Sequence, residues 1–302
     1  MSSIALLALT ALAATAAGCG PESRPNGQPD SALLAERGTR LAQRLAHPDS
    51  DANAPLAQWD VADPLQEISG LALTSDGRLL AHNDSRGIVV QLDYRRGAVV
   101  KRFMVGNPTV HGDFEAITTM GDSIILLTSD GVLYRFAEGR DGASVPYVRQ
   151  DTGLGDQCEF EGMAYDPSAK VLLLACKHAH AKALKDSLVI FRWPVATDDS
   201  AASPAPSHLA VSRAAIIGSN DWSELHPSDL TIDPFTGNYV LVAAREQALF
   251  EITPTGALVF SRPLPPGHAQ AEGVAITRDS ILMISDEAHG GPALLTLYRW
   301  TR

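Results

Sequence analysis

The chain has few cysteines, few aromatic residues and no long apolar segment. Three cysteines and 6% aromatic residues are spread over 302 residues. The most apolar stretch, Ile4 to Ala17, is 14 residues long. A helix needs about 20 apolar residues to span a bilayer, so this stretch predicts an export signal rather than a membrane-spanning helix.

Basic residues are also scarce. The chain has 24 Lys and Arg against 35 Asp and Glu, which gives a formal net charge of −11. No basic run or basic helix face stands out after residue 55. Binding to a phosphate backbone depends on such clusters, so the sequence predicts no nucleic-acid partner.

Local catalytic motifs are missing as well. There is no Gly-x-Ser-x-Gly elbow, no glycine-rich phosphate loop and no His-Glu-x-x-His. The missing elbow argues against an ordinary serine hydrolase. It does not decide whether the chain is an enzyme, because a site assembled from several repeats leaves no local motif.

The N-terminal segment predicts export and lipid anchoring. Ala16-Ala17-Gly18-Cys19 resembles a bacterial lipobox, in which Cys19 is lipidated; the alternative is an ordinary cleaved signal with an incidental Cys19. We therefore expect a signal peptide over 1–18, a tether with a short helix over 19–55, and a folded domain over 56–302. The expected location is the bacterial cell envelope, with a membrane-anchored lipoprotein facing the periplasm or the exterior.

One short phrase recurs five times in the remaining sequence. The spacings between aligned residues 71, 117, 163, 230 and 274 are 46, 46, 67 and 44. A β-unit that returns every 40 to 50 residues is typical of propeller blades. The copies are Ile68 to Leu73, Phe114 to Thr118, Phe160 to Tyr165, Pro227 to Ile232 and Ala271 to Ile276, and each is followed by a turn and a second apolar run.

The repeats predict an all-β fold, a β-propeller of five four-stranded blades. The outer strands are expected at 99–105, 145–149, 212–217 and 257–262. The fifth blade lacks an outer strand at its own end, and Leu56 to Val61 is expected to supply it. The interval of 67 residues contains a polar insertion, Thr197 to Ser207, and leaves room for a sixth blade as the alternative.

The two remaining cysteines predict a disulfide in the third blade. Cys158 precedes the inner strand and Cys176 ends the next strand, so an antiparallel hairpin would place them opposite each other. An exported protein favours the bond. Two buried thiols are the alternative.

Acidic residues recur where inner strands begin and second strands end. Antiparallel pairing brings these positions to one end of the central channel, which we call the mouth. The best candidates for metal ligands are Glu115, Glu161 and Glu272, because the repeat phrase places them in register. Oxygen ligands favour Ca²⁺. The other residues expected at the mouth are Ser69, Asp84, Lys177, Ser228, Asp229, Arg245, Glu246 and Asp286, with Asp130 and Glu287 as the bases of a hydrolase. The alternative is that these polar residues only cap strand ends.

The order of the repeats resembles the SdiA-regulated family of bacterial envelope propellers. The resemblance covers about residues 63 to 300 and is strongest over Cys158 to Ala175 and His226 to Ile252. It implies Ca²⁺ at a propeller site. Glu115-Ala116 stands where the family usually has Glu-Gly, which leaves the carboxylate in place. The Glu-Gly-Val-Ala and Ser-Asp-Glu phrases are more loosely similar to phytase-like and esterase-like propellers.

Two functions follow from these observations. The favoured hypothesis is a lipid-anchored, non-catalytic propeller that binds an unknown small ligand or an envelope protein at its mouth, with Ca²⁺ there. The alternative is a metal-dependent hydrolase of the phytase, esterase or lactonase type.

Overall fold

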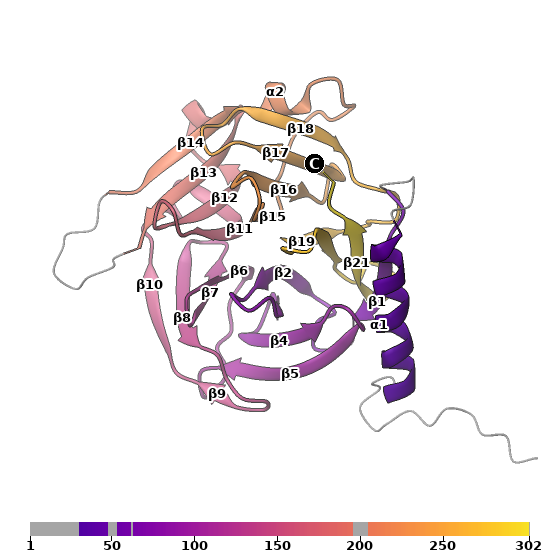
Figure 1. Ribbon diagram of the computed structural model, residues 1–302. Helices are drawn as coiled ribbons and strands as arrows, with labels where there is room; N and C mark the ends of the chain where they lie inside the picture. Colours follow the sequence, from indigo (N-terminus) through magenta and orange to yellow (C-terminus); the bar gives the residue numbers. More distant parts are fainter. Residues whose placement is uncertain (1–29, 48–52, 62, 196–204, 302) are drawn as a thin grey trace, which may run out of the picture.

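Five sheets form a closed ring in the computed structural model (Figure 1). The structure describes residues 30–47, 53–61, 63–195 and 205–301. The predicted signal peptide, Cys19 and most of the polar insertion lie outside these residues. Within the described residues, no helix is long and apolar enough to cross a membrane.

Each blade consists mainly of strands that follow one another in the chain, listed here from the inner strand outward. Blade 1 has β2 (Ile68–Leu73), β3 (Leu79–Asn83), β4 (Ile88–Asp93) and β5 (Ala98–Val105). Blade 2 has β6 (Phe114–Met120), β7 (Ser123–Thr128), β8 (Val132–Ala137) and β10 (Tyr147–Asp151). Blade 3 has β11 (Cys158–Asp166), β12 (Val171–Ala179), β13 (Ser187–Pro194) and β14 (Ser207–Ser212). Blade 4 has β15 (Asp229–Ile232), β16 (Tyr239–Ala243), β17 (Ala248–Ile252) and β18 (Leu258–Pro263). Blade 5 has β19 (Ala271–Ile276), β20 (Ile281–Asp286), β21 (Ala293–Arg299) and β1 (Ala57–Val61).

The ring closes through its inner strands and its core. β2, β6, β11, β15 and β19 contact one another in cyclic order, and β19 contacts β2. Five clusters of buried apolar side chains lie at the five junctions between neighbouring blades. This packing on both faces explains why second strands such as β3, β16 and β20 are buried along their whole length. The predicted five-bladed propeller is confirmed, and no sixth blade is needed.

The N-terminal strand completes the last blade, as predicted. β1 pairs antiparallel with β21, from Ala57 opposite Leu297 to Val61 opposite Ala293. The first and last strands of the domain are thereby joined in one sheet, which leaves blade 5 with four strands.

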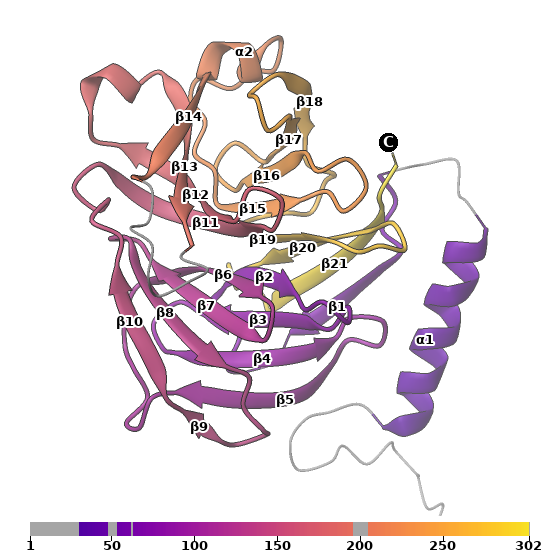
Figure 2. The same ribbon diagram turned by 60° about the vertical axis from the view of Figure 1, so that its left-hand side comes forward.

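Helix α1 (Ser31–Ala46) lies along the outer side of this closing blade (Figures 1 and 2). It lies within the segment 19–55, where a short helix was expected, and the Asp30 side chain accepts a hydrogen bond from the Leu33 N–H at 2.7 Å as N-cap. Leu41 is buried in the core cluster between blades 5 and 1. Arg299 donates to the Arg44 and Leu45 carbonyls at the C-terminal end of the helix. The helix therefore covers part of the blade that closes the ring.

Two outer strands differ from the prediction. Residues 213–217 form a short helix, α2 (Arg213–Ile217), and the outer strand of blade 3 is β14, which ends at Ser212. The segment expected as the outer strand of blade 2 is divided. β9 (Ser144–Val145) pairs in parallel with β5 of blade 1, and β10 supplies the edge of blade 2. The prediction missed this because the connection between β8 and β10 crosses to the neighbouring blade.

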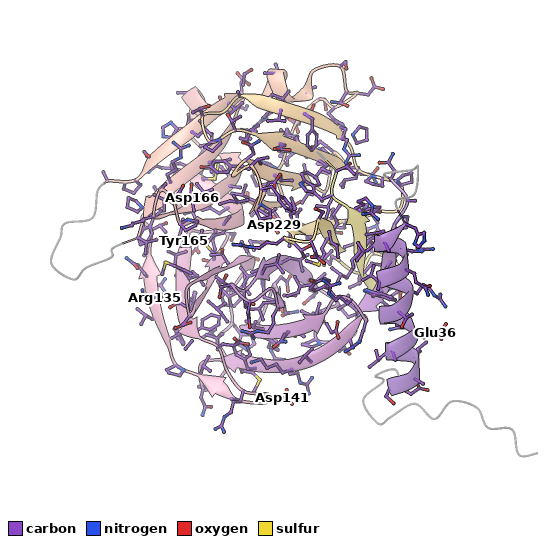
Figure 3. The ribbon with its side chains drawn as sticks, in the orientation of Figure 1. Glu36, Arg135, Asp141, Tyr165, Asp166 and Asp229 are labelled. Carbon is purple, nitrogen blue, oxygen red and sulfur yellow. A yellow bond between two sulfur atoms is a disulfide. The ribbon has the colours of Figure 1, made fainter. Side chains whose placement is uncertain are left out.

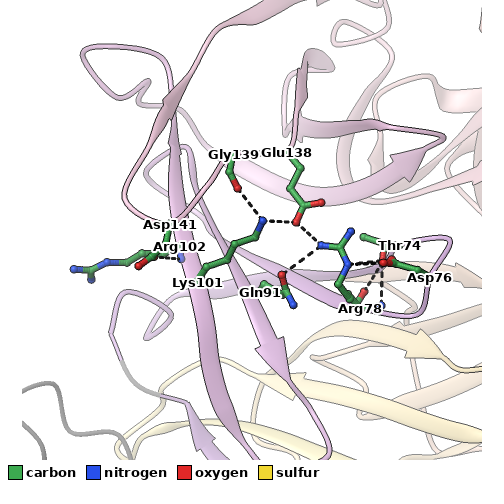
Figure 4. Close-up of polar contacts among 9 residues, drawn as sticks. All are labelled: Thr74, Asp76, Arg78, Gln91, Lys101, Arg102, Glu138, Gly139 and Asp141. Carbon is green, nitrogen blue, oxygen red and sulfur yellow. Dashed lines mark hydrogen bonds and ion pairs between the residues drawn. The ribbon is translucent and has the colours of Figure 1, made fainter.

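A network of polar contacts stabilises the connection between β8 and β10 where it crosses to blade 1 (Figure 4). Glu138, which follows β8, forms ion pairs with Arg78 and with Lys101, whose Nζ lies 2.6 Å from the Glu138 Oε1. Lys101 also donates to the Gly139 carbonyl at 2.8 Å, and the Asp141 Oδ1 accepts from the Arg102 N–H at 3.0 Å. These contacts tie the segment before β9 to blade 1.

Glu138→Gln is expected to lower the free energy of unfolding by about 1 kcal/mol at pH 7, because the pairs are only partly buried. The Arg78 hydrogen bond holds the pKa of Glu138 below its usual value of 4.5. The stabilisation is therefore present above pH 4.5 and is lost as the pH falls through the folded-state pKa. Urea unfolding at pH 7 and at pH 3.5 measures this. Asp122→Asn, in an exposed turn of blade 2, is the control. A difference as large at pH 3.5 as at pH 7 would contradict the ionic origin.

Candidate binding site at the channel mouth

The repeat phrase forms a β-bulge at the start of the inner strand. In blade 2, Phe114 pairs with Thr128 and Ala116 with Leu127, so Glu115 has no partner in the ladder. Glu161 of blade 3 and Glu272 of blade 5 likewise have no partner in their ladders. A bulge redirects the extra side chain and is common beside functional sites. Three blades therefore present a glutamate from the same structural position.

The glycine after the glutamate allows neighbouring inner strands to approach closely. A Cβ atom on Gly162 would lie 2.9 Å from the Leu230 nitrogen of blade 4. One on Gly273 would lie 2.3 Å from the Ser285 Oγ and 2.8 Å from the Leu71 Cγ. The Glu-Gly pair thus combines a side chain turned out of the ladder with a residue that fits only without a side chain. Blade 2 has the buried Ala116 in place of the glycine.

The three predicted glutamates lie near one another and near one lysine. The Lys177 Nζ lies 2.5 Å from the Glu161 Oε1. Lys177 also attracts the carboxyl groups of Glu115 and Glu272, and Glu161 repels both of them. The structure therefore brings together Glu115, Glu161, Glu272 and Lys177. We call these four residues the mouth cluster.

Burial shifts the protonation of the mouth cluster. Desolvation, followed by repulsion from Glu161, raises the pKa of Glu115 to about 9. The same two causes raise the pKa of Glu272 to about 8. Burial also raises the pKa of Glu161, and attraction by Lys177 opposes this shift. At neutral pH Glu115 and Glu272 are therefore largely protonated, and Glu161 is the glutamate whose charged form Lys177 stabilises by direct contact.

Asp229 lies near the centre of the ring (Figure 3) and is 1% exposed. Its carboxyl oxygens accept the Leu230 N–H at 2.7 Å and the Val274 N–H at 2.8 Å, and the Leu71 backbone also donates to it. Burial raises the pKa of Asp229 well above its usual value, against these three donors. Asp229 therefore joins the inner strands of blades 4, 5 and 1. Its place is inside the fold, not on a surface open to ligand as predicted.

Two histidine–carboxylate pairs lie beside the inner strands of blades 4 and 5. The His226 Nδ1 lies 2.8 Å from the Glu246 Oε1, and the His268 Nδ1 lies 2.6 Å from the Asp286 Oδ2. The His268 Nε2 also meets the Tyr298 hydroxyl at 2.9 Å. Each histidine lies three residues before an inner strand; Asp286 ends the second strand of blade 5, and Glu246 lies three residues after that of blade 4. Glu246 and Asp286, predicted as ligand residues, are thus engaged within the fold.

The histidines of these pairs were not among the predicted site residues. The available signal was a histidine three residues before Asp229 in blade 4 and four residues before Glu272 in blade 5. Both stand opposite an acid at the end of the second strand. The ring of His178 from blade 3 also contacts His226, with ring centres 4.7 Å apart.

The other predicted residues differ in their surroundings. The Ser228 hydroxyl is buried and donates to the Ala271 carbonyl at 2.6 Å. Ser69 lies in the bulge of blade 1. Burial raises the pKa of Asp84 to about 6, together with a hydrogen bond to the Glu67 side chain and repulsion from it. Arg245 is exposed, and its Nη1 atom lies 3.7 Å from the Glu224 Oε2.

The two residues predicted as bases of a hydrolase do not lie in the same surroundings. Asp130 is exposed in the turn after β7 and accepts a hydrogen bond from the Thr128 hydroxyl. Glu287 is partly buried, accepts from the Gln270 side chain, and repels the Glu272 carboxyl group. Of the two, only Glu287 adds negative charge beside the mouth cluster.

The mouth cluster does not fit the predicted Ca²⁺ site. Among the described residues, no three Asp, Glu, His or Cys side chains are arranged so that they could hold a metal ion. The cation that Glu161 meets is Lys177, and Glu115 and Glu272 are largely protonated at neutral pH. The arrangement of the described residues therefore gives no support to calcium binding by these glutamates.

The predicted disulfide is present in blade 3. Cys158 and Cys176 are bonded, with their Cα atoms 5.8 Å apart, and both residues are buried. They are not directly opposite each other as expected, because Cys158 pairs with Ala179 and Cys176 with Phe160. The offset arises at the hairpin turn, where Asp166 pairs with Val171, whereas opposed cysteines would need a turn centred on Pro167.

The fold is similar to solved enzyme propellers. No protein-family model and no curated protein matches the chain. The glutaminyl cyclase of Myxococcus xanthus is 14% identical over 81% of this chain and 94% of that chain, with a TM-score of 0.51. The PQQ-bound aldose sugar dehydrogenase of Streptomyces coelicolor is 14% identical over 81% of this chain and 97% of that chain, with a TM-score of 0.52. At this identity the similarity establishes the propeller fold alone.

Proposed function

We propose that the chain is a non-catalytic binding propeller whose mouth cluster takes a positively charged group of a small ligand or of an envelope protein. The observation that carries the proposal is the repeated bulge, which turns Glu115, Glu161 and Glu272 toward one shared lysine. Three acids facing a single cation leave a local excess of negative charge once they are ionised. Such a field favours cationic partners.

The protonation of the free site supports the same proposal. A bound cation favours the charged form of a neighbouring carboxyl group and lowers its pKa. Glu115 and Glu272, with pKa values of about 9 and 8, would then release protons when a cation binds near neutral pH. Binding should therefore tighten as the pH rises from 7 toward 9.

The hydrolase alternative has less support. It requires a metal ion held by the three glutamates, and the described side chains do not form such a ligand set. Glutaminyl cyclase and sugar dehydrogenase activity belong to the solved propellers named above. A sequence identity of 14% is too low to assign either activity to this chain. The lipid anchor and the envelope location are part of the proposal, on the sequence of residues 1–19.

Isothermal titration calorimetry with spermidine, L-arginine amide and CaCl₂ tests the proposal. We expect an organic cation to bind with release of protons, seen as an enthalpy that changes with the ionisation heat of the buffer. Glu115→Gln and Glu272→Gln should weaken binding by about tenfold each, which corresponds to about 1.4 kcal/mol. Glu36→Gln, on the exposed face of α1, is the control. The absence of heat with both organic cations, or binding unaffected by the two mouth variants, would contradict the proposed cationic ligand.

A further inference from the structure

The β11–β12 ladder contains two bulges in immediate succession. Glu159 pairs with His178 and Phe160 with Cys176, so Lys177 is the extra residue on β12. Phe160 pairs with Cys176 and Gly162 with Ala175, so Glu161 is the extra residue on β11. The two residues left out of the ladder are the ones that form the ion pair. The corresponding ladders of blades 1, 2 and 5 have a single irregularity each.

The disulfide lies at this double bulge. Cys176 immediately precedes Lys177, and its ladder partner Phe160 immediately precedes Glu161. Cys158 lies two residues before Phe160 and is bonded to Cys176, so the bond connects the two strands where their register shifts. Cys158 and Cys176 are the only cysteines in the described part of the chain.

The double bulge needs a constraint of this kind for a physical reason. Each bulge disrupts the ladder locally, and Phe160–Cys176 is the one rung that remains between the two. The lysine side chain has many rotamers, so a short contact with Glu161 requires that both backbones be held at a fixed separation. Repulsion of Glu161 by Glu159 and Asp113 acts against that position. A covalent bond across the strands supplies the constraint that the broken ladder lacks.

We propose that Cys158 and Cys176 are positioning residues for the mouth cluster. Their disulfide holds the bulged Glu161 and Lys177 against each other. Without it the propeller remains folded, but the ion pair is lost. The consequence for ligand affinity rests on the proposed function, whereas the consequence for the ion pair does not.

The test compares the wild-type protein with the Cys158→Ala/Cys176→Ala double variant. Alanine is used instead of serine because both sites are buried, and a buried serine hydroxyl would have no water to hydrogen-bond with. The readouts are the ¹⁵N signal of the Lys177 ammonium group and the hydrogen exchange of the Glu161 and Lys177 amides. Leu79→Ala, in the core between blades 5 and 1 and away from blade 3, is the control for a general loss of stability.

In the double variant, at a temperature where circular dichroism shows a native fold, we expect the Lys177 ammonium signal to become that of a solvated lysine. Amide exchange at Glu161 and Lys177 should accelerate by about tenfold or more through local opening. The Leu79→Ala variant should leave both readouts as in the wild type. An unchanged Lys177 signal in the folded double variant would overturn the proposal, as would an equal change in Leu79→Ala.

If the double variant does not fold, the oxidised wild-type protein is reduced with a phosphine after folding. The same readouts are then taken while circular dichroism is still native, and retention of the ion pair under these conditions would overturn the proposal. Spermidine titration of the same samples separates the two hypotheses. Loss of the ion pair with unchanged spermidine binding would contradict the proposed function and leave the positioning role intact.

Discussion

Lys177→Met is expected to lower the free energy of unfolding by about 2 kcal/mol at pH 7. Breaking a buried ion pair by removing one partner typically costs about 3–5 kcal/mol, because the remaining charge is left buried. Glu161 is nearly inaccessible here, but 35% of the Lys177 side chain is exposed. Water therefore screens part of the interaction, and we expect a value below that range. Urea unfolding at pH 7 measures the change.

A double-mutant cycle assigns this loss to the pair itself. Glu161→Gln removes the charge that Lys177 neutralises, so Lys177→Met should cost much less in that background. Lys185→Met, at an exposed position after β12, is the matched control and should change stability little. Equal costs of Lys177→Met in the presence and absence of the Glu161 carboxyl group would contradict the ion pair described above.

Glu115→Gln is expected to raise the free energy of unfolding, by about 2–5 kcal/mol at pH 8. The folded-state pKa of Glu115 is about 9, well above the ordinary value of 4.5. Between these values the unfolded chain has released the proton that the folded chain still binds. Wild-type stability therefore falls as the pH rises from about 4.5 to about 9, by up to about 1.4 kcal/mol per pH unit for this group. Glutamine does not titrate, so the variant avoids this loss.

Thermal or urea unfolding from pH 4 to pH 9 follows the effect. The two proteins should be equally stable near pH 4, where Glu115 is neutral in both states, and should diverge as the pH rises. Glu36→Gln, on the exposed face of α1, should show no such divergence. A Glu115→Gln variant less stable than the wild type at pH 8 would show that Glu115 stabilises the fold, as the strand-capping interpretation requires.

The propeller could be predicted from the sequence because its cause is local and repeated. Each blade needs an apolar inner strand, a turn and an apolar second strand, and that pattern returns five times. The closure by β1 followed from a fifth blade with no outer strand of its own. The outer strands were less predictable, since they are more exposed and their ends depend on neighbouring blades. Thus 213–217 became a helix, and β9 joined blade 1.

The site could be predicted only in part. The repeated phrase identified Glu115, Glu161 and Glu272, but strand alternation does not tell a side chain at the mouth from one inside the fold. In blade 4 the corresponding position holds Ser228, and the acid that follows it, Asp229, is enclosed by backbone donors. The disulfide was inferred from a hairpin that turns at Pro167, whereas the turn lies later, with Asp166 opposite Val171. Bulges arise from contacts between blades, such as the close approach at Gly162, which one sequence does not display.

Carboxyl ¹³C NMR titration of Glu115, Glu161 and Glu272 tests the central claim most directly. A shared, partly buried cluster predicts that Glu115 titrates near pH 9 and Glu272 near pH 8. Lys177→Met should move the titration of all three upward, because Lys177 lowers the pKa of each. Three independent titrations near pH 4.5, unaffected by Lys177→Met, would contradict the account.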